Sequence, residues 1–273
     1  MSAAAGLARL AGPGHAGAAA ARAGIARLAL EARNEAGTGA FASVGDYLAE
    51  LSGRTVCLTL LAGSGTRWVK SLAAGRERGD PAALGFDPAA PRGLFPVRDF
   101  LGASRRPDGL VAIAAYALAA LRGLGGRILV VRGWEEEIDR EVLAPLGIAA
   151  GERSYVTQAA PFGKPLGHGD AAWQCRGLLA GADYVVVNFG GDASSALTAS
   201  SSLLALDALN ASGTRTDLLM PAAFLPAPAY PIGLDAAGLP RSFGHAKLSG
   251  AAVAGGPGYA NVGVRLYRAP ALL

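Results

Sequence analysis

A glycine-rich turn directly follows an apolar segment in the first third of the chain. The segment Thr55–Leu61 reads TVCLTLL, and after it come Ala62, Gly63, Ser64, Gly65, Thr66 and Arg67, with Lys70 three residues further on. Glycines allow backbone N–H groups to approach a bound anion, and an arginine offers a planar fork of donors to phosphate oxygens. The pattern indicates a phosphate-binding turn, and a plain turn after a buried strand is the structural alternative.

Two common phosphate-binding motifs do not fit this turn. The dinucleotide fingerprint G-x-G-x-x-G needs a third small residue so that the following helix can pack on the strand, and here that position is Trp68. No G-x-x-x-x-G-K-[ST] sequence passes through these residues either, which excludes a P-loop. An NAD(P)-dependent oxidoreductase is therefore disfavoured.

Two later segments also carry polar residues among glycines and prolines. One reads PRGLFPV over 91–97 and contains Arg92; the other reads VTQAAPFGKPLGHGD over 156–170. In the second, the Gln158 amide both donates and accepts, so it could recognise the edge of a pyrimidine. His168 could contact a phosphate or hold the turn, and Asp170 suits a helix N-cap.

A carboxylate also follows a second apolar, strand-like segment. The sequence VVVNFGGD ends at Asp192. A carboxylate after a central strand is a suitable ligand for a hard cation such as Mg²⁺, especially when phosphates complete the coordination. Capping of the next helix is the structural alternative for Asp192.

These segments, in this order, resemble the sugar-nucleotide pyrophosphorylases, nucleotidyltransferases that join a nucleoside triphosphate to a sugar 1-phosphate. Residues 63–67 (GSGTR) match the G-x-G-T-R turn of that family, although Leu61 stands where the family usually has a small residue. PRGLFPV resembles the P-K-G-x-F-x-V element of the UDP-sugar branch, with Arg92 in place of the lysine. The sequence GHGD and the acidic Asp192 after glycine match two further elements.

The resemblance implies a Mg²⁺-dependent transferase, with UTP and a sugar 1-phosphate as its substrates. Asp192 would hold the metal, Arg67 with Lys70 or Arg92 would bind the triphosphate, and Lys247 would meet the sugar phosphate. The nucleotide-binding residues would be Ala62, Gly63, Ser64, Gly65, Thr66, Gln158, Gly167 and His168, and the sugar contacts Asn188 and Asn261. Because Arg92 replaces a lysine and Ala246 an acidic residue, a weakened relative that binds a sugar nucleotide as a sensor or scaffold is the alternative.

The elements that must position these residues alternate between strand and helix. We expect strands at 55–61, 127–132, 154–157 and 183–188, and helices at 108–121, 135–146, 170–179 and 201–209. Residues 76–107 read as a long loop, and the part from 217 onward mostly as strands. This pattern predicts an α/β fold with a doubly wound, mostly parallel, Rossmann-like sheet, whose carboxyl ends carry the ligand site.

An Ala-rich helical segment precedes this alternation. Gly-Thr-Gly at 37–39 separates two expected helices within it. We therefore predict an N-terminal helical segment over 1–53, followed by a catalytic domain over 54–273 whose strand-rich last part binds the sugar.

Composition narrows the function classes. The chain has 273 residues, of which 51% are hydrophobic and 17% charged, with a formal charge of +4. No run of basic residues indicates a nucleic-acid partner, and arginines interrupt the apolar N-terminal stretch, so no membrane segment is expected. Two isolated cysteines favour a reduced, cytoplasmic protein. We expect a monomer or small homo-oligomer. Only three basic residues are lysines, Lys70, Lys164 and Lys247, and all lie in or beside the matched elements.

Overall fold

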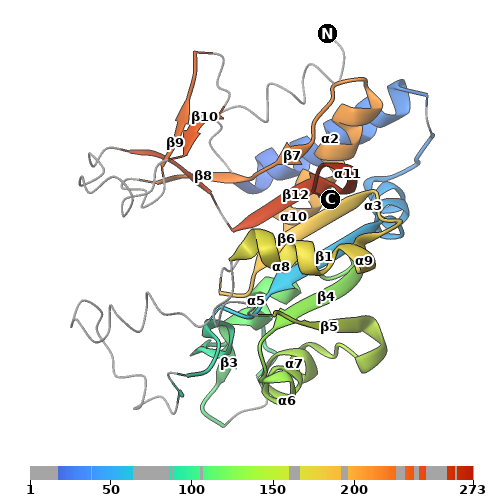
Figure 1. The fold of residues 1–273 in the computed structure, drawn as a ribbon. Coiled ribbons are helices and arrows are strands. Elements are labelled where there is room, and N and C mark those ends of the chain that lie inside the picture. The colour runs from blue at the N-terminus through green and yellow to red at the C-terminus, as the bar shows by residue number, and fades with distance from the viewer. Residues whose placement is uncertain are drawn as a thin grey trace. The chain divides into compact units, whose positions relative to one another are not determined.

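The computed structural model describes most of the chain and divides it into two compact units. The described residues are 18–37, 39–63, 86–87, 89–104, 107–159, 167–191, 196–225, 231–236, 240–243, 257–261 and 263–272. One unit comprises residues 1–51 and 197–268, and the other comprises 52–196 and 269–273. Figure 1 shows the elements of both.

Four parallel strands form the centre of the second unit. They lie in the order β5 (Arg153–Thr157), β4 (Gly126–Val131), β1 (Thr55–Leu60) and β6 (Tyr184–Phe189). In register, Leu58 lies beside Ile128 on one side and Val187 on the other. Strands covered on both faces are apolar almost throughout, which is why the runs TVCLTL and YVVVNF fold as central strands.

Helices connect these strands and cover the sheet. Figure 1 shows α8 (His168–Gln174) and α9 (Arg176–Leu179) in front of β1 and β6, and α5 (Ile113–Ala119) behind. After β4, a continuous helical stretch comprises α6 (Glu135–Ile138), a π-helical turn (Asp139–Leu143) and α7 (Ala144–Leu146). The unit also contains a 3-10 turn (Ala150–Glu152) and the terminal turn α11 (Ala269–Leu272).

The helix expected over 108–121 is partly wrong. Its first part forms strand β3 (Leu110–Ala112), which pairs with β2 (Pro96–Arg98), and only α5 is helical. The apolar side chains of Leu110 and Val111 suit either a helix or a strand. Pairing with β2, which lies within the expected loop, selects the strand. The segment PRGLFPV lies within the expected loop, but it forms the 3-10 turn η2 (Arg92–Leu94) and then enters β2.

A polar cluster fixes strand β5 to the π-helical turn. Arg153 binds both carboxylate oxygens of Asp139, at 2.7 and 2.6 Å, and the Tyr155 hydroxyl donates to Asp139 at 2.8 Å. Burial alone would raise the pKa of Asp139, but these hydrogen bonds and the charge of Arg153 hold it below its ordinary value.

The first unit joins the N-terminal helices to a later helix. It contains α2 (Ala18–Glu35), α3 (Val44–Ser52, whose last residue falls in the other unit) and α10 (Ala196–Ala211, which begins there). Arg33 donates to Asp207 at 2.9 Å, and the Tyr47 hydroxyl donates to the same carboxylate oxygen at 2.5 Å. All three side chains are buried, so this ion pair ties α2 and α3 to α10.

The strands expected after residue 217 are present in the first unit. β7 (Leu218–Leu219) pairs antiparallel with β12 (Val264–Arg268). A separate antiparallel sheet has the order β10 (Pro240–Phe243), β9 (Pro231–Leu234), β11 (Gly258–Asn261) and β8 (Ala222–Leu225).

The α/β class and the mostly parallel arrangement predicted from the sequence are confirmed by the second unit. The break at 37–39 between two helices is also confirmed, since α2 ends at Glu35 and α3 begins at Val44. Across the described part of the chain, the helices are all too short or too polar to cross a bilayer. The predicted domain boundary at 53 stays a prediction.

Candidate functional site

The carboxyl ends of β1 and β6 lie where open α/β sheets have their ligand crevice. From β1 the chain adds β4 and β5 on one side and then returns to add β6 on the other, so the strand order reverses between β1 and β6. In open α/β sheets the ligand crevice lies at this reversal. Residues Leu61–Gly63 leave β1 there, and Gly190 leaves β6 with its N–H bound to the Leu60 carbonyl at 3.1 Å.

Leu61 fills the space beneath this crevice because two glycines leave room for it. Leu61 is 2% exposed and belongs to the apolar cluster around β4 and α5. A Cβ atom on Gly190 would lie 2.1 Å from the Leu61 Cδ2, and one on Gly93 would lie 2.9 Å from the same atom. The larger residue at 61 is therefore accommodated by glycine at 93 and 190.

Arg92 lies across the backbone of β6's carboxyl end. Its N–H donates to the Gly63 carbonyl at 3.2 Å. A Cβ atom on Gly191 would lie 3.1 Å from the Arg92 Nε and 3.2 Å from its Cδ, so the side chain passes directly over this glycine. The guanidinium is exposed, and within the described residues it forms no hydrogen bond or ion pair. Gly63, Arg92 and Gly191 therefore lie together at the crevice, where the Arg92 guanidinium can bind an anion.

Gln158 organises the neighbouring turn at the end of β5. Its side chain is 6% exposed, and its amide nitrogen donates to the Gly167 carbonyl at 3.2 Å and to Asp170 at 3.1 Å. Asp170 also accepts from Gln174 at 2.7 Å. Among the described residues the Gln158 Oε1 has no hydrogen-bond partner, so one edge of the amide remains for recognition.

The structure corrects the helix cap expected in this turn. Helix α8 begins at His168, and its N-cap is Gly167, whose φ of 101° favours glycine. Asp170 lies in the first turn of the helix and accepts from two glutamines instead of capping it. The His168 ring packs against the ring of Phe189, at 4.4 Å between centroids, which joins the turn to the end of β6.

Asn188 is buried within the sheet. It is 0% exposed, and its amide donates to the Ala117 carbonyl of α5 at 2.9 Å. Its Oδ1 and the hydroxyl of its register partner Thr59 are both buried, and neither has a hydrogen-bond partner among the described residues. A sugar contact by Asn188 would require it to leave the Ala117 carbonyl, so its expected sugar-binding role stays a prediction.

The remaining predicted residues lie wholly or partly outside the described structure. Asn261 belongs to β11. The residues outside the described ranges are Ser64, Gly65, Thr66, Arg67, Lys70, Asp192 and Lys247. Their roles stay predictions. Gly191, the residue before Asp192, is described and lies at the crevice.

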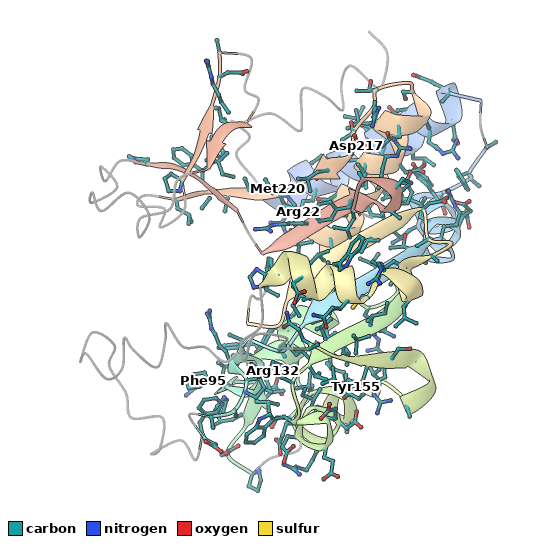
Figure 2. All side chains as sticks on the ribbon, in the orientation of Figure 1. Arg22, Phe95, Arg132, Tyr155, Asp217 and Met220 are labelled. Carbon is teal, nitrogen blue, oxygen red and sulfur yellow. The ribbon has the colours of Figure 1, made fainter. Side chains whose placement is uncertain are left out.

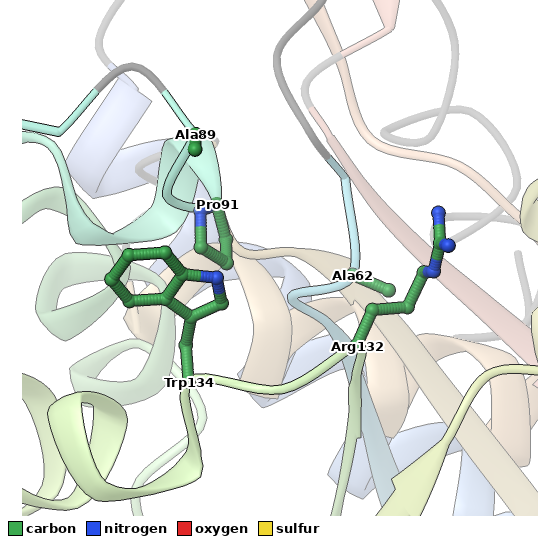
Figure 3. A pocket seen from close by; sticks show the side chains of 5 residues that line it. All are labelled: Ala62, Ala89, Pro91, Arg132 and Trp134. Carbon is green, nitrogen blue, oxygen red and sulfur yellow. The ribbon is translucent and has the colours of Figure 1, made fainter.

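The sequence interpretation missed Arg132 and Trp134, which line a cavity at the carboxyl end of β4. The cavity has a volume of about 180 Å³ and is also lined by Ala62, Ala89 and Pro91. Figure 3 shows the Trp134 indole beside Pro91 and the Arg132 side chain beside Ala62. An arginine at the end of the apolar run RILVV is the signal that could have identified the site, since carboxyl ends of parallel strands face the ligand.

The described residues contain no group of three or more His, Cys, Asp or Glu side chains placed to hold a metal.

The comparisons with known proteins give structural similarity but no sequence match. No family model matches the chain, and no curated protein matches its sequence. Among solved structures, one described as "putative UDP-N-acetylglucosamine pyrophosphorylase from Entamoeba histolytica" is similar over 82% of this chain, with 12% sequence identity and a TM-score of 0.48. The present chain spans 61% of that protein's length.

Proposed function

We propose that the protein is a nucleotidyltransferase that joins a nucleoside triphosphate to a sugar 1-phosphate. In this reaction a phosphate oxygen of the sugar 1-phosphate attacks the α-phosphorus of the triphosphate. The bond from the α-phosphorus to the bridging oxygen of the β-phosphate breaks, and pyrophosphate leaves with that oxygen. The protein's task is to align two anions and to offset their charge, since little covalent chemistry falls to its side chains.

The observation that carries the proposal is the arrangement of Gly63, Arg92 and Gly191. These residues come from three separate segments and meet where the strand order reverses. The exposed side chain of Arg92 lies directly over the backbone of Gly191, where any other residue would place its Cβ atom. An arginine fork that has no partner among the described residues suits phosphate oxygens at such a position.

The turn at Gln158 offers a partner to the nucleotide base. We propose that the Gln158 amide oxygen accepts from the base, while the amide nitrogen holds the turn through Gly167 and Asp170. A partner that donates at one edge, such as the N3–H of uracil, matches this acceptor. UTP is therefore the triphosphate we propose.

The roles of the residues outside the described ranges complete the proposal. Arg67 and Lys70 would add charge around the triphosphate, Lys247 would bind the sugar phosphate, and Asp192 would hold Mg²⁺. When bound, the ion would neutralise phosphate charge. Gly191, the residue that precedes Asp192 in the chain, lies at the crevice, which supports this assignment.

A screen of nucleoside triphosphates against sugar 1-phosphates, followed by pyrophosphate release, tests the function. We expect release to require both substrates and to be greatest with UTP. Asp192→Asn should abolish Mg²⁺-dependent release, whereas Glu136→Gln, at an exposed carboxylate of α6, should leave it unchanged. Absence of release with every substrate pair would refute the proposal.

A second candidate function is binding of a sugar nucleotide without turnover. It is favoured by Arg92, because a guanidinium replaces the lysine of the family at a reacting phosphate and the two cations are not interchangeable. Calorimetry with UTP and UDP-sugars, alongside the release assay, separates the two functions. Binding without release would favour a sensor or scaffold.

A further inference from the structure

Arg132 is an exposed cation at the carboxyl end of the parallel sheet. It follows Val131, the last residue of β4, and is labelled in Figure 2. Among the described residues it forms no hydrogen bond or ion pair, in contrast to Arg127 at the other end of β4, which pairs with Glu152 at 3.2 Å. No described residue therefore neutralises the charge of Arg132.

The turn after Arg132 holds an unusual backbone conformation. Gly133 has a φ of 78°, and Trp134 has φ 70° and ψ 20°. The left-handed region is sparsely populated by residues other than glycine, and Trp134 is the only described non-glycine residue in it. Such outliers persist where surrounding packing holds them, and they cluster at ligand sites. Here the half-buried indole packs against the apolar cluster that includes Leu61 and Ile138.

The cavity beside this turn places a flat apolar wall opposite the arginine. Trp134 and Pro91 lie on one side of it, and Ala62 with the stem of Arg132 lies on the other (Figure 3). The cavity has a volume of about 180 Å³ and is open to solvent. It lies directly beside the start of the glycine turn.

Two residues that line the cavity are the chain neighbours of crevice residues. Pro91 precedes Arg92, and Ala62 precedes Gly63, so the end of β1 has an exposed guanidinium on each side: Arg92 toward β6 and Arg132 toward β4. A single phosphate needs only one such fork. Two forks flanking one strand end suit a ligand with several phosphates in a chain.

We propose that Arg132 is a second polyphosphate-binding cation, and that Trp134 supplies the wall against which the nucleotide packs. The inference rests on the proposed function, because it names how the same crevice binds its triphosphate. It does not depend on turnover, since a protein that only binds nucleotides would need the same contact.

Titration calorimetry of the full chain with UTP and with inorganic tripolyphosphate tests the inference. Loss of a charge-assisted contact should weaken binding of both ligands to Arg132→Gln about tenfold or more. Arg122→Gln is the matched control, because Arg122 is also exposed but precedes β4, at the amino end of that strand. Its affinity should equal that of the unmodified protein.

Tryptophan fluorescence supplies a second readout that a merely structural role of Arg132 would not change. UTP should quench emission in the unmodified protein, and most of that quenching should be lost in Trp134→Phe while the affinity falls by less than threefold. Unchanged affinity of Arg132→Gln for both ligands would overturn the inference, as would failure of the unmodified protein to bind either one. Binding that depends on Arg132 without any pyrophosphate release would support the inference and refute the proposed transfer reaction.

Discussion

Substitution of Gly190 by alanine tests whether this glycine exists to make room for Leu61. The new Cβ would lie 2.1 Å from the Leu61 Cδ2, whereas contacting carbon atoms stand about 3.5–4.0 Å apart. One of the two must therefore move by roughly 1.5 Å. Leu61 is 2% exposed within a packed cluster and cannot turn into solvent. Overpacking of this kind costs about 1–3 kcal/mol in the free energy of unfolding.

A double-mutant cycle with Leu61→Ala isolates this contact. Leu61→Ala alone should lower the free energy of unfolding by about 2–5 kcal/mol, because it leaves a cavity. In that background the alanine at 190 no longer meets the leucine side chain. The double mutant should therefore be about as stable as Leu61→Ala, with a coupling energy of about 1–3 kcal/mol.

Urea unfolding followed by circular dichroism measures all four proteins. Gly177→Ala is the control, since this glycine of α9 has nothing within 4 Å of the added Cβ and alanine favours helix by up to about 1 kcal/mol. Additive losses, within about 0.5 kcal/mol, would refute the explanation that Leu61 and Gly190 share one space.

Three further predictions follow from buried and paired groups. Asp207→Asn breaks the buried pair with Arg33 and should lower the free energy of unfolding by about 3–5 kcal/mol. Glu31→Gln, in the exposed pair of α2, should change the free energy of unfolding by less than 1 kcal/mol. Equal effects of the two substitutions in urea unfolding would contradict this prediction. Since the folded-state pKa of Asp139 is lowered, its contribution is present above its ordinary pKa of 3.8 and is lost as pH falls through the lower folded value. Asp139→Asn should therefore be less stable than the unmodified protein at pH 7, with the difference shrinking toward pH 2; a difference independent of pH would contradict it. Burial raises the pKa values of both cysteine thiols, to about 12 and about 11, so a thiol reagent at pH 8 should label neither before unfolding and both after it.

The central strands could be predicted from the sequence because burial on both faces leaves a simple signal. β1, β4 and β6 are apolar runs bounded by glycine or charged residues, and each lies within one or two residues of its predicted range. Strand β3 could not be predicted in this way, because its three residues are helix-compatible and only pairing with β2 selects the extended form.

The sequence predicted the separate segments of the candidate site, but not how these segments come together in space. Glycine and arginine spacing pointed to Gly63 and Arg92, while the passage of Arg92 over Gly191 depends on packing between segments about a hundred residues apart. The role of Asp170 was assigned from helix preference alone, and hydrogen bonding to Gln158 overrode that preference. Arg132 carried no motif, and only its place at the end of β4 reveals it.

The division of the chain has a consequence for synthesis on the ribosome. The unit built from 52–196 with the short segment 269–273 is nearly continuous, whereas residues 1–51 join a unit completed only by 197–268. The bond from Arg33 to Asp207 spans 174 residues. At translation rates of about 5–20 residues per second, the N-terminal helices would wait roughly 10–35 s for their partner. During that interval their apolar faces are targets for chaperones, and shortening the interval should raise the yield of folded protein.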